Sequence, residues 1–530
     1  MLTRLAGGRV IDPAHDRDNP GDVWFEDGRI VAPPQDRVAD ATHDVSGAIV
    51  LAGGIDIHSH IAGANVNTAR LLLPELHGTE GFAGAPASLT IGRLYAAMGF
   101  TTVVEPAISP HVATQAQSEL RAIPFIDKAI LAVMGNEDYL IRLLQAGESD
   151  AAVADYVGCM IAGSRALGIK VVNPGGAAAF KANARAFGLD DEVPGTGVSS
   201  RAIIQAMQTA ADALGLAHPV HLHCNNLGIP GNVETALGTI AAAEGRRLHL
   251  AHLQFYAYGT DGPHKFSSAA PALATAVNVN RNITVDVGQV MFGQTVTVSS
   301  DVLRQFVARH SGRPRKAIII DGDGNGGGIV PYNYRRRDFA NAVQFAAGLE
   351  LFLLVDDPWR IFFTTDHPNG APFTAYPDLF ALLMSREYRA QWIATLPVDA
   401  MATTTLPAIA REYGWREIAI LTRAAPARLL GLSDRGHLAP GARADIAVYH
   451  ARVDPATFRN AALVFKDGTL VARDGAVSEP CFGRVLNAVP GFDVAIERRL
   501  ATWYDEIYGV PHTAFRVEPS ELFETVPCLH

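Results

Sequence analysis

The middle of the chain alternates short apolar runs, each the length of a strand, with longer runs that have a helical pattern. Repeated strand–helix units predict a parallel sheet, and eight of them fit a closed barrel. The eight strand-like runs are the one that ends at His60 and those at residues 100–107, 128–134, 168–175, 219–226, 247–254, 283–290 and 361–368. We therefore predict an α/β fold built on a (β/α)8 TIM-like barrel. A further run, "RKAIIIDG" (315–322), predicts an insertion before the last barrel strand.

Both ends of the chain have a different character, with short alternating strands and tight turns. Asp27-Gly28 and Asp467-Gly468 are typical hairpin turns between such strands. Two β-rich ends that flank a long middle favour one β unit built from both. We predict a composite β-sandwich from residues 1–50 and 433–490, a barrel in residues 51–432 and a C-terminal extension in residues 491–530.

Composition limits the classes of protein to consider. A hydrophobic content of 48% with 18% charged residues is typical of a globular chain, and 530 residues predict two or three structural units. The net charge of −10 argues against a nucleic-acid partner. The sequence contains no uninterrupted run of 18 apolar residues, so it predicts no membrane-spanning helix. The N-terminus lacks the apolar core of a signal peptide. The four cysteines form no CxxC pair, which suggests a reducing compartment. We expect a soluble, cytoplasmic protein with no membrane partner.

Histidine, lysine and aspartate stand at the ends of several predicted strands, which in a barrel face the active site. In "AIVLAGGIDIHSH" (48–60), taken as one strand, His58 and His60 alternate and therefore project to the same face. Imidazole and carboxylate are good ligands for zinc and similar ions. Each histidine taken singly could be a hydrogen-bonded core residue, but the whole set is typical of a metal site. The set is His58, His60, Lys170, His223, His252 and Asp366.

Lys170 has two interpretations. It could be a lysine that extends its amine from a strand edge towards water. Beside two cations, however, an ammonium would be repelled and would lose its proton. The neutral amine can react with carbon dioxide to give a carbamate, whose two oxygens can bridge two metals. Because the histidines are present, we favour the carbamate.

Three features near these residues have simpler interpretations. "DGDGNG" (321–326) begins like a calcium-binding loop, but the twelfth position requires glutamate and is Tyr332. We expect a flexible, glycine-rich active-site loop there. Cys224 and His367 are adjacent in sequence to predicted ligands, so in a regular strand they point away from the metal face.

Several motifs together resemble the metal-dependent amidohydrolase superfamily. They are "GGIDIHSH", "GIKVVNPG", "VHLHCNN", "LHLAHLQ", "TTDHPNG" and "AAPARLLGL", the last similar to an "NPARLLG" signature. The resemblance implies a TIM-like barrel that carries a composite β-sandwich, with two divalent metal ions, for which zinc is expected. It implies that His58 and His60 bind the more buried ion and that His223 and His252 bind the second. It also implies that a carboxylated Lys170 bridges the two ions and that Asp366 binds metal and shuttles protons.

Longer stretches resemble one branch of this superfamily, formed by the A subunits of formylmethanofuran dehydrogenases and of bacterial formyltransferase/hydrolase complexes. The stretches are "NVNTARLLLPE", "VVNPGG", "HCNNLGIPGN", "HLQFYAYG" and "TTDHPNGAPFTAYP". This resemblance implies a hydrolase of one-carbon metabolism and methylotrophy that cleaves N-formylmethanofuran or a bacterial analogue to formate and the free amine. It also implies that the partners include a formyltransferase subunit together with other subunits of such a complex.

Two alternatives remain open at this stage. In a redox assembly, the same subunit would be the formate-condensing half of an oxidoreductase, with the electrons handled by partner subunits because the chain has no cluster or dinucleotide motif. Alternatively, the chain could be a non-catalytic scaffold. The presence of all six predicted metal-site residues argues against the scaffold.

Overall fold

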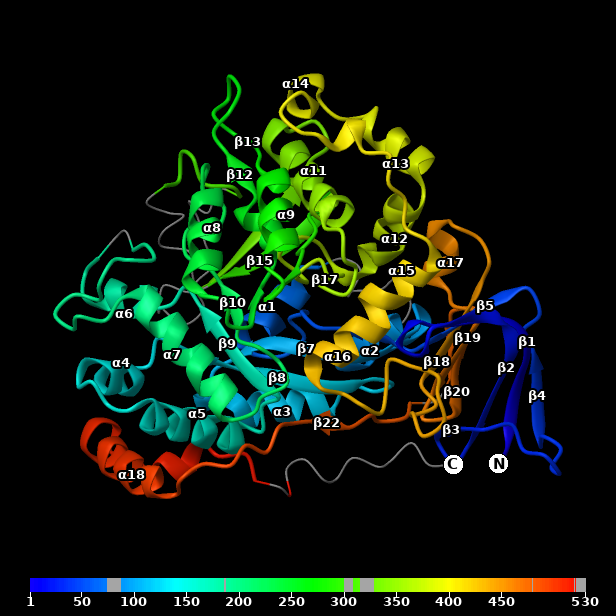
Figure 1. The fold of residues 1–530 in the computed structure, drawn as a ribbon, viewed down its shortest axis with the longest axis horizontal. Coiled ribbons are helices and arrows are strands. Elements are labelled where there is room, and N and C mark those ends of the chain that lie inside the picture. The colour runs from blue at the N-terminus through cyan, green and yellow to red at the C-terminus, as the bar shows by residue number, and fades with distance from the viewer. Residues whose placement is uncertain are drawn as a thin grey trace.

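The computed structural model describes residues 1–73, 87–184, 187–299, 308–314, 328–478, 480–518 and 520. Figure 1 shows a barrel surrounded by helices, with a separate group of strands on one side that contains the N-terminal strands and later strands of the chain. Two sheets, each of nine strands, account for these two parts.

The barrel contains the eight predicted strands in chain order, and all neighbouring pairs along it are parallel. A parallel bridge between Ser59 and His367 joins the first strand region to the last, and the His60 N–H donates to the His367 carbonyl at 2.8 Å. The predicted barrel is therefore confirmed. Its strands are β6 (Gly54–Asp56), β7 (Phe100–Ile108), β8 (Asp127–Met134), β9 (Gly168–Val172), β10 (His221–His223), β11 (Leu248–Leu250), β14 (Ile283–Asp286) and β17 (Ile361–Phe362).

Helices cover the barrel and connect its strands. Several begin with a side-chain cap: Ser149, Ser199 and Asp338 accept a hydrogen bond from the backbone N–H three residues later. The helices are α1 (Ala64–Leu71), α2 (Ala87–Ala97), α3 (Ala113–Arg121), α4 (Asp138–Gln145), α5 (Asp150–Ser164), α6 (Gly176–Lys181), α7 (Ser200–Ala213), α8 (Val233–Ala242), α9 (Ala270–Val279), α11 (Phe339–Leu354), α12 (Tyr376–Met384), α13 (Arg386–Ile393), α14 (Val398–Met401), α15 (Trp415–Ala419), α16 (Ala425–Leu430), α17 (Pro455–Arg459) and α18 (Ala495–Tyr508). No helix among the described residues is long and apolar enough to span a membrane.

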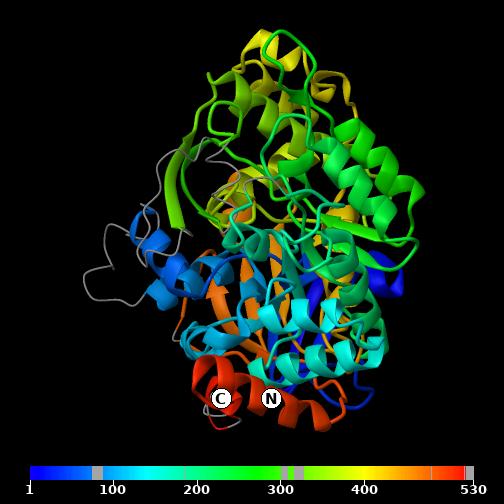
Figure 2. The same ribbon diagram turned by 90° about the vertical axis from the view of Figure 1, so that its left-hand side faces the viewer.

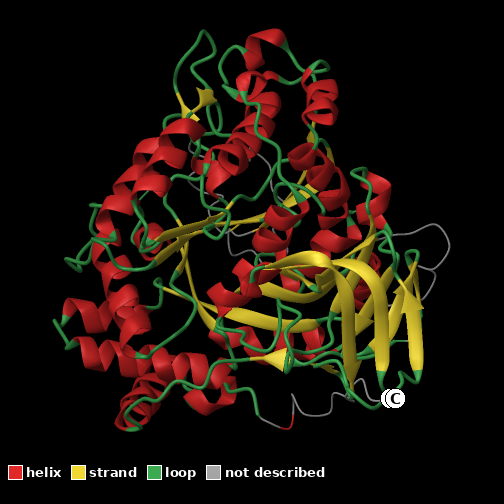
Figure 3. Ribbon diagram, turned by 45° about the vertical axis from the view of Figure 1, so that its right-hand side comes forward, coloured by secondary structure: helices red, strands yellow, loops and turns green. Residues whose placement is uncertain are grey.

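The second sheet combines strands from both ends of the chain, as predicted, and lies beside the barrel (Figure 3). Its order is β21-β20-β19-β18-β5-β1-β2-β3, with β4 paired to β1. Phe25 on β2 and Phe465 on β19 have ring centroids only 5.1 Å apart, although three strands separate them in the sheet. The sheet therefore folds over itself around a shared apolar core. Its strands are β1 (Thr3–Asp12), β2 (Arg17–Glu26), β3 (Arg29–Val31), β4 (Ala41–Asp44), β5 (Ala48–Ala52), β18 (Ile446–His450), β19 (Leu463–Lys466), β20 (Thr469–Arg473) and β21 (Ala476–Val477).

The run "AIVLAGGIDIHSH" is two strands rather than the single strand we expected. β5 belongs to the composite sheet, and β6 begins the barrel. Gly53 and Gly54 lie where the chain passes between the sheets. A Cβ at Gly53 would lie 2.2 Å from Thr101 Oγ1, and one at Gly54 would lie 2.7 Å from the Phe100 ring. The two glycines are required because the next barrel strand passes directly beside them.

One segment of the predicted sandwich lies elsewhere. β22 (Val485–Leu486) falls within 433–490, but it pairs with the barrel strand β8. β8 is longer than its neighbour β9 at its N-terminal end, where Lys128 and Ala129 have no partner on β9 and pair with β22 instead. The other proposed domain boundaries stay predictions.

A hairpin lies between the seventh and eighth barrel strands, where the sequence predicts an insertion. β15 (Gly293–Ser299) and β16 (Gly328–Tyr334) pair antiparallel over seven residues each. The strand predicted at 315–322 and the glycine-rich loop predicted at 321–326 lie outside the described residues.

The C-terminal extension packs against the helices of the barrel, where Figure 2 shows α18 beside α4 and α5. Arg499 forms an ion pair with Glu148 at 2.7 Å, and the Val517 N–H donates to the Gly163 carbonyl at 2.8 Å. These contacts attach residues 495–517 to the outside of the barrel, away from the composite sheet.

Candidate metal centre

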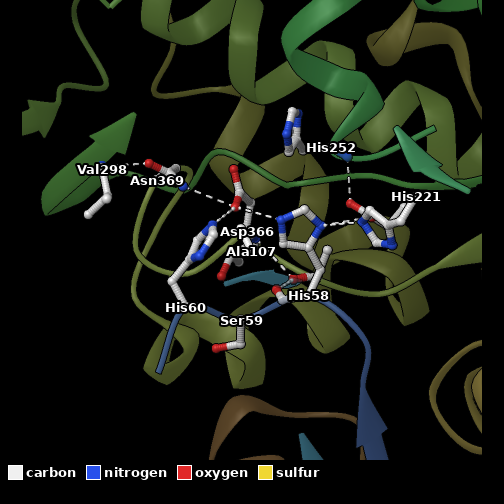
Figure 4. Close-up of polar contacts among 12 residues, drawn as sticks. His58, Ser59, His60, Ala107, His221, His252, Val298, Asp366 and Asn369 are labelled. Atoms are coloured by element: carbon white, nitrogen blue, oxygen red, sulfur yellow. Dashed lines mark hydrogen bonds and ion pairs between the residues drawn. The ribbon is translucent and has the colours of Figure 1, made fainter. Parts of the chain in front are cut away.

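Two predicted ligands follow β6 and meet a third that follows β17. Nε2 of His58 lies 3.0 Å from Oδ1 of Asp366, and Nε2 of His60 lies 3.3 Å from the same oxygen (Figure 4). All three side chains are buried or nearly so. Two imidazole nitrogens and one carboxylate oxygen therefore converge on a space that can hold a cation.

A second carboxylate holds each of these histidines from behind. Nδ1 of His58 donates to Oδ2 of Asp286 at 3.0 Å, and Nδ1 of His60 donates to Oε1 of Glu105 at 2.9 Å. A histidine that donates its Nδ1 proton to a carboxylate can offer the lone pair of Nε2 to a cation, the usual arrangement behind a metal-bound histidine. Burial alone lowers the pKa of His60, but Glu105 and Asp366 outweigh burial and raise this pKa to about 9. The carboxylates of Glu105 and Asp366 therefore favour a positive charge at this point.

His223 and His252 lie beside this group. Their ring centroids are 4.6 Å apart, and the His252 ring is 5.3 Å from the His58 ring. Burial lowers the pKa of His252 well below its ordinary value, so the ring is neutral, as a metal ligand must be. Its Nδ1 has no hydrogen-bond partner within the described residues. A buried nitrogen with an unused lone pair fits a ligand of a second ion.

Lys170 on β9 completes the predicted set. Its side chain is 1% exposed, and Nζ has no hydrogen-bond partner in the described part of the chain. Burial lowers the pKa of Lys170 to about 8. Burial of an amine without a hydrogen-bond partner costs folding free energy, so such a group is expected to have a functional role. The six predicted side chains thus offer imidazole, carboxylate and amine groups in one buried region, and this donor set fits divalent ions.

The ends of β11, β14 and β17 differ from the sequence prediction. We expected His252 and Asp366 to lie within strands, but both follow the strand end with a left-handed backbone, at φ values of 36° and 52°. Gly288 lies between them. A Cβ there would lie 2.4 Å from the His252 Cβ and 3.4 Å from the Asp366 Cβ. Strained backbone of this kind is typical of functional sites, and the glycine permits the two ligands to approach.

Sequence reasoning missed the supporting carboxylates. Asp286 contacts three histidines through Oδ2, with nitrogens of His58, His249 and His221 at 3.0, 3.1 and 3.3 Å, and its Oδ1 accepts the His252 N–H at 2.6 Å. Burial alone would raise the pKa of Asp286, but the histidines outweigh burial and hold it well below its usual value. A signal was available, because Asp286 and Glu105 are acidic residues inside apolar runs, "ITVDVGQV" and "TTVVEPA".

The two neighbours of predicted ligands make contacts of their own. Cys224 is 1% exposed, and burial raises the pKa of its thiol to about 12, so it stays protonated. His367 accepts the Phe373 N–H at its Nδ1 at 3.2 Å and packs edge-on against the Phe373 ring. Both observations agree with the simpler interpretation of these residues.

Comparison with known proteins identifies a family and two related proteins. Residues 41–477 match the family described as Amidohydrolase family. The chain is 48% identical over 548 aligned residues, 100% of both chains, to the A subunit of the formyltransferase/hydrolase complex Fhc of Methylorubrum extorquens. It is 35% identical over 512 residues to protein FwdA of Methanocaldococcus jannaschii, covering 90% of this chain and 89% of that one.

Two solved structures have a similar fold. A chain in the crystal structure of the Methylorubrum extorquens formyltransferase/hydrolase complex FhcABCD with methylofuran superposes with a TM-score of 0.93 at 48% identity, covering 99% of this chain and 98% of that one. A D-aminoacylase structure shares the fold at 15% identity and a TM-score of 0.53, covering 92% of this chain and 99% of that one.

Proposed function

Because the chain belongs to the amidohydrolase family, we propose that it is the hydrolytic subunit of a formyltransferase/hydrolase complex. In this proposal it cleaves the formyl amide of a methanofuran-type carrier to formate and the free amine. The observation that carries the proposal is the full-length similarity to the Fhc protein, whose complex has been crystallised with methylofuran. The convergence of His58, His60 and Asp366 supports a metal-dependent reaction.

We assign His58, His60 and Asp366 to one divalent ion, and His223 and His252 to a second. The carboxylates behind the first pair and the unused Nδ1 of His252 support this assignment. Zinc is the expected metal because it prefers imidazole and carboxylate ligands. Bound ions would supply Lewis acidity, which activates water near neutral pH and stabilises negative charge on the formyl oxygen.

We assign Lys170 as an N6-carboxylated lysine that bridges the ions. Its buried Nζ has no acceptor among the described residues and lies in the same region as the histidines. The neutral amine adds to carbon dioxide, so that one N–C bond forms while one C=O π bond and one N–H bond break, and the released proton leaves a carbamate with charge −1. The carbamate would offer the ions two anionic oxygens, where the neutral amine offers only one nitrogen.

We assign Asp366 as the proton carrier. Oδ1 faces the histidines, whereas Figure 4 shows the other carboxylate oxygen turned away from these contacts. In the proposed hydrolysis, water adds its oxygen to the formyl carbon and the C–N bond breaks. The proton lost by the water passes to Asp366 and then to the leaving amine nitrogen. A positioned acid–base of this kind contributes about 10²–10⁴-fold to the rate.

A redox assembly is the second candidate, because the sequence also resembles the A subunits of formylmethanofuran dehydrogenases. The test is to give the metal-loaded complex the formylated carrier amine and to measure formate without any electron donor or acceptor. The proposal expects formate from the native complex and none from His58→Ala or His60→Ala complexes. Formate that forms only when a redox partner is present would assign the chain to a dehydrogenase assembly instead.

A further inference from the structure

The loop after β17 places an amide against the Asp366 carboxylate. Nδ2 of Asn369 donates to Oδ1 of Asp366 at 3.0 Å, and the backbone N–H of Asn369 donates to the Asp366 carbonyl at 2.6 Å. Asn369 is buried, with 6% of its surface exposed. The same Oδ1 faces His58 and His60, so three groups converge on one oxygen of the carboxylate (Figure 4).

The orientation of this amide is fixed by its other end. Oδ1 of Asn369 accepts the backbone N–H of Val298 at 2.7 Å. A backbone N–H can only donate, so the amide oxygen must face Val298 and the NH2 group must face Asp366. The Asn369 side chain therefore connects strand β15 to the carboxylate.

The hairpin holds this loop at two more points. Oγ1 of Thr295 on β15 donates to the carbonyl of Pro368, and the hydroxyl of Tyr334 on β16 donates to the carbonyl of Asn369 at 3.3 Å. Both of these side chains are buried. The loop that carries Asp366 is thus supported by an inserted element and not only by the barrel.

A carboxylate needs such support to keep its two oxygens distinct. Rotation about the bond to an aspartate carboxylate is soft, and the two oxygens exchange when it turns. A donor fixed on Oδ1 keeps that oxygen towards the histidines and leaves the other oxygen for a different partner. The amide adds this restraint without adding charge.

We propose that Asn369, held by the β15–β16 hairpin, is a positioning residue that fixes the Asp366 carboxylate, with Oδ1 directed to the first ion and the second oxygen free for proton transfer. This inference rests on the proposed function for its proton-transfer part only. The orientation of Oδ1 towards the histidines can be tested by metal binding alone.

The test compares Asn369→Leu with Asn278→Leu in the otherwise native complex. Asn278 is a matched control because its amide also accepts a backbone N–H, from Asp356, and donates to a backbone carbonyl, of Leu354, both at 3.0 Å. Each protein is loaded with cobalt(II), and the cobalt content, the visible absorption spectrum and the steady-state rates of formate release are measured.

We expect Asn369→Leu to bind cobalt, to change the visible spectrum and to lower kcat about 10- to 100-fold, the usual range for a partner of a metal ligand. KM should change much less than kcat, and Asn278→Leu should match the native protein. A native spectrum and native kcat in Asn369→Leu would overturn the proposal. If the native complex releases no formate, the proposed function fails, but the spectrum still tests the positioning of Asp366.

Tyr334→Phe removes the hydrogen bond to the Asn369 carbonyl and leaves the Asn369 side chain unchanged, and it serves if Asn369→Leu does not fold. It should give a smaller change in the same spectrum and a smaller loss of kcat. Unchanged values in a folded Tyr334→Phe protein, together with a misfolded Asn369→Leu, would count against the hairpin as the support.

Discussion

At the scale of single residues, Asp286 contacts both halves of the proposed centre. Its Oδ2 accepts from His58 and its Oδ1 accepts from the backbone of His252. Asparagine has nearly the same shape but only one acceptor oxygen, so one of these donors would face an NH2 group. We expect Asp286→Asn to weaken metal binding about 10- to 100-fold, the usual effect of losing the partner of a ligand.

Titration of the metal-loaded protein with a chelator checks this prediction, with total metal measured after gel filtration. Asp399→Asn is a suitable control, because the Asp399 carboxylate is exposed and its ion pair is with His264, which is not among the predicted ligands. Native metal retention in Asp286→Asn would show that the carboxylate has a packing role only.

Lys170 gives a second test at this scale. Lys170→Ala removes the proposed bridge and leaves space for a small carboxylate. We expect both metal content and activity to fall, and added short carboxylic acids to restore part of both. Lys181→Ala, at an exposed lysine that pairs with Asp138, should change neither. Two fully retained ions in Lys170→Ala would exclude the bridge.

At the scale of elements, the ends of three barrel strands meet at Gly288. The residue has φ 66°, and an added Cβ would lie 2.4 Å from the Cβ of His252. Gly288→Ala therefore has two costs, the left-handed backbone and the collision. Gly215→Ala has only the first, because Gly215 has φ 65° and no atom within 4 Å of an added Cβ.

We expect both alanine variants to lose about 1–2 kcal/mol of stability because of the left-handed backbone. Only Gly288→Ala should also lose metal from the His223 and His252 side, since His252 must move. Elemental analysis and thermal unfolding of the two variants measure the two effects separately. Equal metal contents would contradict the role assigned to Gly288.

The elements also show what the sequence could and could not predict. The short apolar runs that alternate with helical runs were sufficient to predict the eight barrel strands and their order along the chain. The length and the hydrophobic period of a run are local properties that can be read from the sequence. The division of "AIVLAGGIDIHSH" between two sheets depends on which strand passes beside Gly53, a tertiary contact. The left-handed conformations of His252 and Asp366 could not be predicted from the sequence. Backbone strain of this kind is imposed by the surrounding structure and does not change the spacing of apolar residues along the chain.

The site shows the same limit. The six side chains could be proposed as a set because they stand in predicted barrel strands or at their ends, and the structure places them near one another. Asp286, Glu105 and Asn369 support ligands from other elements, and one sequence without structure does not say which buried carboxylate lies behind which histidine.

At the scale of the whole molecule, a buried group of charges connects the composite sheet to the barrel. Nζ of Lys466 on β19 lies 3.1 Å from Asp127 on β8 and 3.0 Å from Asp445. Arg435 also contacts Asp127, and all four side chains are buried. Burial opposes the charges, but Lys466 and Arg435 outweigh it and hold the pKa of Asp127 well below its usual range. The aspartates likewise raise the pKa of Lys466.

The sign of the pH effect follows from these directions. A depressed carboxyl pKa gives stability that is present above the unfolded value, about 3.9, and is lost as pH falls below it. A raised lysine pKa gives stability that is fully present below about 10.4, the unfolded value, and is lost as pH rises above it. The pair Lys466–Asp127 therefore stabilises the native state between about pH 4 and pH 10. The pKa of Asp445 is raised by burial and opposes this effect in part.

Lys466→Met keeps the length of the side chain and removes its charge, which leaves Asp127 and Asp445 with less compensation in a buried site. Removal of one partner of a buried pair costs about 3–5 kcal/mol, so we expect a lower thermal midpoint at pH 7. We also expect the loss of stability in acid to begin at a higher pH than in the native protein, because the carboxyl pKa values rise when the cation is removed. Thermal scans from about pH 3 to pH 9 at one heating rate measure both effects. Arg201→Met, which breaks the exposed pair with Asp190, should lie within about 1 kcal/mol of the native protein throughout. An acid limb in Lys466→Met that coincides with the native one would show that Arg435 and the Arg484 N–H, which donates to Asp127 at 2.6 Å, hold Asp127 in its charged form without Lys466.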